Sequence, residues 1–491
     1  MWPRCPCLER VVTDTSAQRA DRLERSLGDP FDPLGPVGFE AVIAADERRE
    51  PVAGAAPLLA EFGCGAEIVP TKLGGRLREI DGLIEVMQPL ARRDPSLALA
   101  HFGLPLVGAI GLWSRGRDDQ RRAGAELLLR GGRLTAAFGW GQACAELPRL
   151  DLRGAEFGLS GRCALVADAD RADALLIPAR VDPARGGRRS EWLLVDMAGA
   201  PRGTVEHLPR VRTLGLTGLR FAAVEFHGLR LSADSVLDGG GRGEDAAAGT
   251  SATILRTVLP AIALAGLDTA LRLTFHHLHS RRLYGGTASD LPAIRSLLAR
   301  TFVDLMVCDC LVTTAARMIS WLPAQAGLYS LASFCLAADV VPAAMYRLSV
   351  GLGARFYVRE GASGMFQKLL RDLKPLGLAG AAVAAAEHAL VEATASGCPL
   401  ENEPPGQLPP RSLEAQAQQA KRLVRLFAAS ACADTREAPA WLQGAMETRL
   451  GSGGLGDAPI AQDVEAALFT ELCRRCEESR GLGLAARQLA Y

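Results

Sequence analysis

The chain has 491 residues, of which 48% are hydrophobic and 22% are charged, and its formal net charge is zero. This composition is typical of a globular protein with two or three domains. The neutral balance excludes the charge excess that recruits nucleic acid or an anionic membrane, so we expect neither as a partner. The first 27 residues contain no apolar stretch of signal-peptide length, and the apolar runs are shorter than a membrane span. We therefore expect a cytoplasmic protein whose cysteines are mostly reduced and buried.

Residues from about 30 to 130 have the pattern of a helical domain. The segment 34–50 follows a start rich in Pro and Gly and leads into apolar residues at helical spacing. The same spacing recurs further on, at Ile80, Leu83, Ile84, Met87 and Leu90. Pro95 predicts a break before the next apolar helix.

The pattern changes near Gly131, and residues 131–240 predict a β domain. Short apolar runs lie between clusters of turn-forming residues, at 157–159, 174–177, 192–195 and 224–226. Such spacing favours an antiparallel sheet, with the chain reversing at each turn cluster.

Helical periodicity returns after Ser251 and predicts a helical bundle over 250–395. The expected helices cover 255–283, 291–321, 337–352 and 366–391. A Pro-rich linker over 398–411 separates the bundle from more helix, so residues 396–491 form a linker and a helical C-terminal extension. The fold class is therefore α+β.

This order of elements, together with several short strings, resembles the acyl-CoA dehydrogenase family. The strings are 69–75 (VPTKLGG), 157–162 with 172–180, 213–218 with 224–226 and 231–237, 281–285 (RRLYG), and 353–372, which ends in Arg371-Asp372. They follow one another in the family's order from about residue 35 to 395. The resemblance implies the family's fold: an N-terminal helical domain, a middle antiparallel β-barrel or sandwich domain, and a C-terminal four-helix bundle.

The resemblance also implies a chemistry. In the family a carboxylate removes the α-proton of an acyl thioester while FAD accepts the β-hydride. The usual base follows the Arg-Asp pair by a few residues, and that position is Ala379 here; the alternative position, on the first helix of the bundle, is Leu255. Neither side chain can carry a proton, so no catalytic residue is assigned. Glu360 and Glu387 are the carboxylates nearby in sequence that we consider as a relocated base.

The strings that hold the cofactor are only partly kept. Residues 138–146 and 163–166 depart from the family's flavin-contacting turn and strand, which weakens FAD binding without excluding it because main-chain amides remain. The resemblance implies that Arg281 meets the cofactor pyrophosphate across a subunit interface, with cofactor contacts at Tyr284, Gly285 and Gly353. It places Arg256 next to the acyl-CoA channel, as a substrate-binding residue. The alternatives are a solvated charge for Arg281 and a structural role for Arg256.

Other polar constellations favour structural roles. Asp372 is typical of an ion-pair partner within a helix bundle. His276, His277 and His279 lie on one helix without further ligands nearby in sequence, so we expect no metal site. The pairs Cys308/Cys310 and Cys473/Cys476 lack the second pair of a zinc module, and we expect packing roles for them.

Three functions stay open. The first is a FAD enzyme that desaturates an acyl thioester carried on CoA or on an acyl carrier protein. The second is a base-less partner subunit of an active homologue, and the third is a repurposed member of the fold, either a flavin oxygenase or a non-redox enzyme. We expect a homo-oligomer, or a hetero-oligomer with a homologous subunit, paired through apolar bundle residues at Leu297, Phe302, Leu305 and Met306.

Overall fold

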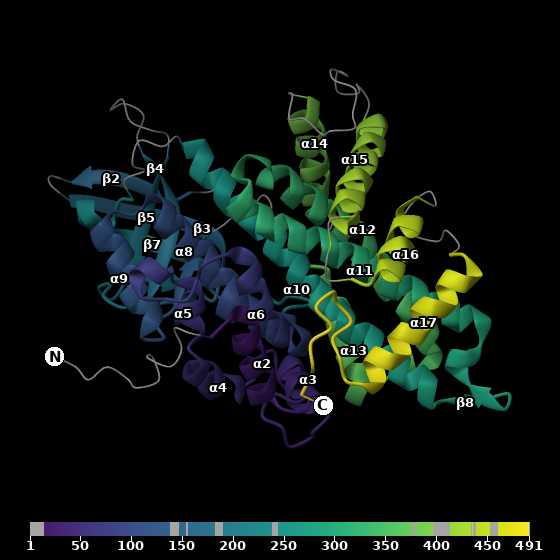
Figure 1. Cartoon of the computed structure of the whole chain (residues 1–491). Helices are drawn as coiled ribbons and strands as arrows, with labels where there is room; N and C mark the ends of the chain where they lie inside the picture. The colour runs from purple at the N-terminus through teal and green to yellow at the C-terminus, as the bar shows by residue number, and fades with distance from the viewer. Residues whose placement is uncertain are drawn as a thin grey trace.

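The computed structural model covers helices at both ends of the chain and a sheet between them (Figure 1). The described residues are 14–137, 147–153, 156–181, 190–237, 244–376, 380–395, 413–433, 435, 438–451 and 460–490. The predicted α+β order of helices, sheet, helices and helical extension is confirmed.

The N-terminal region is a group of helices around an apolar core. They are α2 (Ser16–Leu27), α3 (Phe39–Arg48), α4 (Ala55–Phe62), α5 (Cys64–Ile68), α6 (Ile80–Arg93), α7 (Pro95–Ala98), a π-helical turn (Leu99–Gly103), α8 (Leu104–Arg115) and α9 (Asp118–Leu129). The expected break at Pro95 is confirmed: Asp94 accepts a hydrogen bond from the Ser96 N–H, which caps α7, and Pro95 occupies its first turn. The sequence pattern does not predict α2, which a capping box between Thr15 and Gln18 begins.

One seven-stranded sheet forms the middle of the chain. Its strands are β1 (Leu134–Ala136), β2 (Arg149–Arg153), β3 (Glu156–Ala167), β4 (Ala174–Val181), β5 (Ser190–Asp196), β6 (Val205–His207) and β7 (Phe221–Leu231). The order across the sheet is β1-β4-β2-β3-β7-β6, and β5 also pairs with β4. The sheet is mainly antiparallel, but β1 and β2 both run parallel to β4. Alternate side chains such as Leu175 and Ile177 of β4 are fully buried in the core of this domain.

The bundle consists of long helices that follow one another up and down. They are α10 (Glu244–Ser280), α11 (Pro292–Trp321), α12 (Pro323–Leu352), α13 (Gly361–Leu373) and α14 (Ala381–Ala395); the short hairpin β8 (Arg282–Leu283) and β9 (Gly286–Thr287) joins α10 to α11. The single helix predicted over 366–391 is two helices. Pro375 lacks the N–H that a continuing helix needs, and Gly380 adopts a φ of +63°.

The C-terminal extension packs on the bundle. Its helices are α15 (Leu413–Ala433), α16 (Ala440–Gly451) and α17 (Gln462–Glu477), which lie against α11 (Figure 1). Arg449 of α16 donates from Nε to Asp304 of α11 at 2.9 Å, and the Arg475 guanidinium lies 5.4 Å from the Phe302 ring. Phe302, Leu305 and Met306 are at most 1% exposed within one chain. The prediction that these residues pair two subunits is therefore wrong, because contacts within the chain already cover them.

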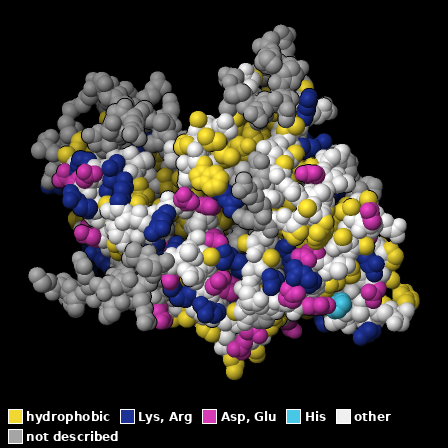
Figure 2. All heavy atoms as spheres, viewed as in Figure 1, with side chains coloured by type: hydrophobic (Ala, Val, Ile, Leu, Met, Phe, Trp, Pro, Cys, Tyr) yellow, Lys and Arg dark blue, Asp and Glu magenta, His cyan; other side chains and the backbone are white. Residues whose placement is uncertain are grey.

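Within the described ranges, three helical stretches are long and apolar enough to cross a membrane: 95–115, 250–280 and 323–357. The expectation that every apolar run is too short for a span is wrong for these three. Between 78% and 89% of their apolar windows is buried inside the protein, so they supply its core. On the face shown in Figure 2, Lys and Arg side chains are interspersed with Asp and Glu, in keeping with a net charge of zero.

Candidate functional site at the domain junction

A buried ionic network joins the three parts of the chain. Lys368 of α13 lies with its Nζ 2.7 Å from Asp94 Oδ1, at the start of α7, and it also contacts the Asp372 carboxylate. Asp372 accepts a hydrogen bond of 2.6 Å from the Leu216 N–H in the loop before β7. The Lys368, Asp94 and Asp372 side chains are at most 3% exposed. The interpretation of Asp372 as an ion-pair partner is confirmed.

The charges of this network depend on one another. Burial disfavours the Lys368 ammonium, but the carboxylates of Asp372 and Asp94 outweigh that effect and raise the pKa of Lys368. Burial, together with the nearby Asp94 charge, raises the pKa of Asp372, and Lys368 opposes the rise. Lys368 is thus a cation shared by two buried carboxylates, and the network depends on it.

Arg371 makes a second set of contacts with the same loop. Its guanidinium donates to Asp46 of α3 at 2.7 Å, and Asp46 also accepts from the Thr217 hydroxyl. A Cβ on Gly215 would lie 2.1 Å from the Arg371 carbonyl oxygen, so only glycine permits this approach. Arg371 and Asp372 therefore anchor the end of α13 to the β domain, just ahead of residue 379. Ala379 itself lies outside the described residues.

The substrate-binding candidate Arg256 lies on α10, next to Leu255. Leu255 is half-buried and packs against the core. Burial lowers the pKa of Arg256, and the guanidinium lies near the Cys335 thiol of α12. No carboxylate among the described residues forms an ion pair with it. A partly buried guanidinium without an ion-pair partner can donate hydrogen bonds to a carbonyl or anionic oxygen of a ligand.

Of the two carboxylates considered as a relocated base, only Glu387 has a perturbed environment. Glu360 is exposed at the start of α13. Glu387 of α14 is half-buried, and burial, followed by the charge of Asp339, raises its pKa. Burial raises the pKa of the Cys335 thiol to about 12. The charge of Glu387 contributes to this rise in pKa, and the charge of Arg256 opposes it. Glu387 is therefore a carboxylate with a raised pKa whose charge acts on the same thiol as that of the substrate-binding candidate.

The four cofactor candidates follow the C-terminal ends of α10 and α12. Arg281 and Tyr284 are exposed, and Tyr284 and Gly285 form the β8–β9 turn with φ of +49° and +85°. Gly353 follows α12 with a φ of +56°, and no protein atom lies within 4 Å of a Cβ built there or at Gly285. Arg281 forms no ion pair with a described residue.

Two further residues lie at this end: Arg355, which the sequence analysis did not single out, and His277, for which it expected a structural role. His277 of α10 carries a buried Nε2 atom without a hydrogen-bond partner among the described residues. Burial lowers its pKa, and the charges of Arg355 and Arg281 lower it further, so the three side chains are neighbours. A signal for His277 was its place four residues before Arg281, one helical turn away.

The region of the flavin-contacting strings is described only in part. Residues 138–146 lie outside the described residues. In the second string, Cys163 and Val166 of β3 are buried in the core of the β domain, with 5% and 1% of their surface exposed. Their side chains provide no polar partner for a flavin ring, so any contact from this strand would use the main chain.

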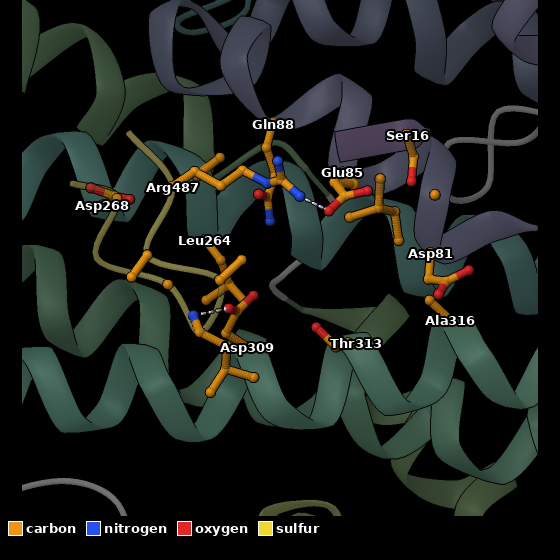
Figure 3. A pocket seen from close by; sticks show the side chains of 18 of the residues that line it. Ser16, Asp81, Glu85, Gln88, Leu264, Asp268, Asp309, Thr313, Ala316 and Arg487 are labelled. Carbon is orange, nitrogen blue, oxygen red and sulfur yellow. Dashed lines mark hydrogen bonds and ion pairs between the residues drawn. The ribbon is translucent and has the colours of Figure 1, made fainter. Parts of the chain in front are cut away.

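The end of the chain closes a cavity of about 250 Å³ between α6, α10 and α11 (Figure 3). Arg487 reaches across it to Glu85 of α6, and the Leu484 N–H donates to Asp309 of α11 at 2.7 Å (Figure 3). Leu482 N–H donates to Asp268 of α10 at 2.9 Å. The last residues thus tie the N-terminal helices to the bundle, which the sequence does not indicate.

Comparison with solved structures identifies the fold. An acyl-CoA dehydrogenase complexed with FAD from Bacillus anthracis matches with a TM-score of 0.69 at 14% identity, over 94% of this chain and 85% of that one. Butyryl-CoA dehydrogenase from Megasphaera elsdenii matches with a TM-score of 0.66 at 16% identity, over 80% and 99%. A prolyl acyl carrier protein oxidase, AnaB, matches with a TM-score of 0.65 at 16% identity, over 77% and 98%. No family model and no curated protein matches the sequence.

The chain therefore has an acyl-CoA dehydrogenase-like fold, as the resemblance implied. At these identities the likeness establishes the fold and not the reaction. The assignment of substrate, cofactor and catalytic groups has to come from the residues themselves.

One titrating group, His101, lies apart from these candidates. It is half-buried on the π-helical turn Leu99–Gly103. Burial, together with the charges of Arg133 and Arg171, lowers its pKa to about 4. Asp168, the carboxylate in the same cleft, has its pKa raised by burial. His101 is therefore neutral in the folded protein at neutral pH.

We expect the free energy of unfolding to fall as the pH drops from 6.5 towards 4. The unfolded chain protonates His101 near its ordinary pKa of 6.5, whereas the folded chain does so only near 4, so protons favour unfolding in this window. At pH 5 this costs about 1–2 kcal/mol. Urea unfolding at pH 7 and pH 5 should show the loss in the parent and in the exposed control His207→Gln, but a smaller one in His101→Gln. An equal loss in all three would contradict the assignment.

Proposed function

We propose that the chain is a flavin-dependent oxidoreductase that binds FAD and an acyl thioester carried on CoA or on an acyl carrier protein. The observation that supports FAD as the cofactor is the cluster of basic side chains at the C-terminal ends of α10 and α12. The charges of Arg281 and Arg355 both lower the pKa of His277, whose buried Nε2 has no hydrogen-bond partner among the described residues, and Gly285 and Gly353 leave their backbone open. Cations and unobstructed main-chain N–H groups are the partners that a pyrophosphate takes. The solved relatives with FAD support this choice of cofactor.

The proposed roles follow the positions of the side chains. Arg281 binds the pyrophosphate, with Tyr284, Gly285 and Gly353 around it. Arg256, partly buried and without a carboxylate partner among the described residues, binds an oxygen of the acyl thioester or its carrier. When bound, FAD would supply the hydride acceptor for an acyl chain.

The missing base favours a second function. Leu255 is aliphatic, and so is Ala379, so neither family position takes up the α-proton. This supports a base-less subunit that completes the site of an active homologue, or an enzyme of this fold, an oxygenase or a non-redox enzyme, whose chemistry needs no proton transfer there. Glu387 is the group that could restore desaturation, because its raised pKa suits it to proton transfer.

We also propose that the protein is a cytoplasmic oligomer in which a second subunit covers the exposed end of α12. Tyr346 and Val350, four residues apart on α12, and Tyr357, in the turn that follows it, are 59–79% exposed, and Tyr284 of the neighbouring hairpin is 93% exposed. Exposed large apolar side chains of this kind are typical of a subunit interface. Sedimentation at micromolar concentration should show a dimer or a larger species. A monomer that persists with FAD added would contradict the proposal.

We expect the purified full-length protein to bind FAD and Arg281→Gln to bind it at least tenfold more weakly. The substitution removes charge-assisted hydrogen bonds to phosphate, which contribute about 1.5–3 kcal/mol. Arg282→Gln is the matched control, because it removes the same charge from the adjacent exposed arginine, which begins β8. Quenching of flavin fluorescence measures both.

If neither the parent nor the control binds FAD, the dehydrogenase-like function fails and a non-redox or partner role replaces it. If FAD binds and Arg281→Gln binds it equally well, the cofactor is held elsewhere and the assignment of Arg281 is wrong.

A further inference from the structure

A second cleft lies between the N-terminal helices and the β domain, and no residue of α10 or of the β8–β9 hairpin lines it. It has two arms, of about 330 and 290 Å³, which share Ala56, Ala100, His101 and Arg133. One arm is lined by most of the charged side chains and is called the polar arm, whereas the other is lined mainly by small and aliphatic residues. The cleft is therefore separate from the residues proposed above for FAD and the acyl thioester.

The polar arm contains more unengaged cations than anions. Arg133 and Arg171 make no hydrogen bond or ion pair through their guanidinium groups with any residue in the described ranges. Among the acids of this arm, Asp168 accepts from the Arg220 N–H at 2.8 Å and its charge also acts on Arg171, and Asp94 contacts Lys368 at 2.7 Å. Glu50, the remaining acid, lies 3.5 Å from Arg48.

Burial and neighbouring charges show that these groups face one space. Burial lowers the pKa of Arg171, so its charge is partly removed from water. The charges of Arg133 and Arg171 both act on His101, which stays neutral and can donate or accept one hydrogen bond. Two guanidinium groups and an imidazole therefore surround the same part of the cleft.

The other arm is lined by small and aliphatic side chains of α4, α5 and α9. Leu59, Cys64, Ile68 and Leu128 present buried apolar walls, and Ala60 is exposed at the rim. This arm begins where the polar arm ends, at Ala100 and His101. A ligand that filled both arms would be charged at one end and aliphatic at the other.

We propose that this cleft binds an amphiphilic anion, a carboxylate or phosphate head on a short aliphatic chain. The head lies between Arg133 and Arg171, whose planar groups suit bidentate hydrogen bonds to either oxyanion. The chain lies along Leu59, Ile68 and Leu128. The site does not depend on the proposed flavin chemistry, because it shares no lining residue with it.

Calorimetric titration of the full-length protein tests the proposal with four probes: octyl phosphate, octanoate, octanol and inorganic phosphate. We expect one octyl anion to bind per chain, at least tenfold more tightly than octanol or inorganic phosphate. The tighter of octyl phosphate and octanoate identifies the head group. If octanol binds as tightly as the octyl anions, or if no octyl anion binds, the proposal is wrong.

Three variants locate the binding. Arg171→Gln should weaken octyl-anion binding at least tenfold, whereas Arg212→Gln, an exposed arginine that does not line the cleft, should leave it unchanged. Ala60→Trp should narrow the apolar arm and weaken the octyl anions, but not inorganic phosphate. Full binding by Arg171→Gln would place the anion elsewhere and overturn the proposal.

The thermal midpoint without ligand serves as the folding control. Arg171→Gln should leave it unchanged, because the side chain has no hydrogen-bond partner among the described residues. If that midpoint shifts, Arg133→Gln replaces it, since Arg133 is exposed. Unweakened binding by this variant would equally overturn the proposal.

Discussion

Replacing Lys368 by Met should lower the free energy of unfolding by about 3–5 kcal/mol at pH 7, as expected when one partner of a buried ion pair is removed. The substitution keeps the aliphatic stem but leaves the carboxylates of Asp94 and Asp372 facing each other in the protein interior. Both are at most 3% exposed, so water cannot replace the lost ammonium. Urea denaturation followed by circular dichroism measures the change.

The deficit should shrink as the pH falls towards 4. Burial and the Asp94 charge raise the pKa of Asp372, and without Lys368 the largest effect that opposes the rise is lost, so protonation of Asp372 stabilises the folded variant relative to the unfolded chain. Lys374→Met is the matched control: Lys374 is exposed at the C-cap of α13, and its loss should change stability by less than about 0.5 kcal/mol. A loss below 1 kcal/mol in Lys368→Met would show that the network contributes little to stability.

With saturated acyl thioesters, the flavin of the parent protein, which has Ala379, should be reduced about 10² to 10⁴ times more slowly than the flavin of a variant with glutamate at that position. The substitution Ala379→Glu supplies the base that the family resemblance implies. Ala381→Glu is the control, because it adds the same charge two residues away, at the exposed start of α14. Anaerobic mixing with a panel of acyl-CoA and acyl carrier protein thioesters, followed by flavin bleaching, measures the rate.

Rapid bleaching by the parent would contradict the prediction and show that another carboxylate takes the proton. Glu387→Gln and Glu360→Gln then separate the two candidates. Glu387 has a raised pKa in a half-buried position, whereas Glu360 is exposed, so only the first substitution should abolish the rate. If FAD binds but the flavin bleaches in none of the variants, the result favours the partner-subunit and non-redox functions.

Much of the fold was predictable because it depends on local patterns. The helical spacing before residue 130, the short apolar runs of the middle domain and the break at Pro95 each reflect the period of the backbone or the chemistry of one residue. The division of 366–391 was missed although Pro375 lies there, because apolar residues on both sides kept the helical spacing. The residue order could also locate the base positions at Ala379 and Leu255, since these follow from counting along a resembling string.

Contacts between residues far apart in the chain could be known only from the folded structure. Lys368 and Asp94 are separated by 274 residues, and Arg487 and Glu85 by 402. The apolar residues Phe302, Leu305 and Met306 indicate burial, but their sequence cannot tell whether a second subunit or the chain's own extension covers them. His277 and Arg355 look like ordinary polar residues until folding places them near each other, and the same is true of Arg133 and Arg171 in the second cleft. The order of elements follows from the sequence because it depends on near neighbours, and the aliphatic residues at positions 255 and 379 are read directly from it. Burial and charge interactions depend on distance in space, which only the packed chain defines.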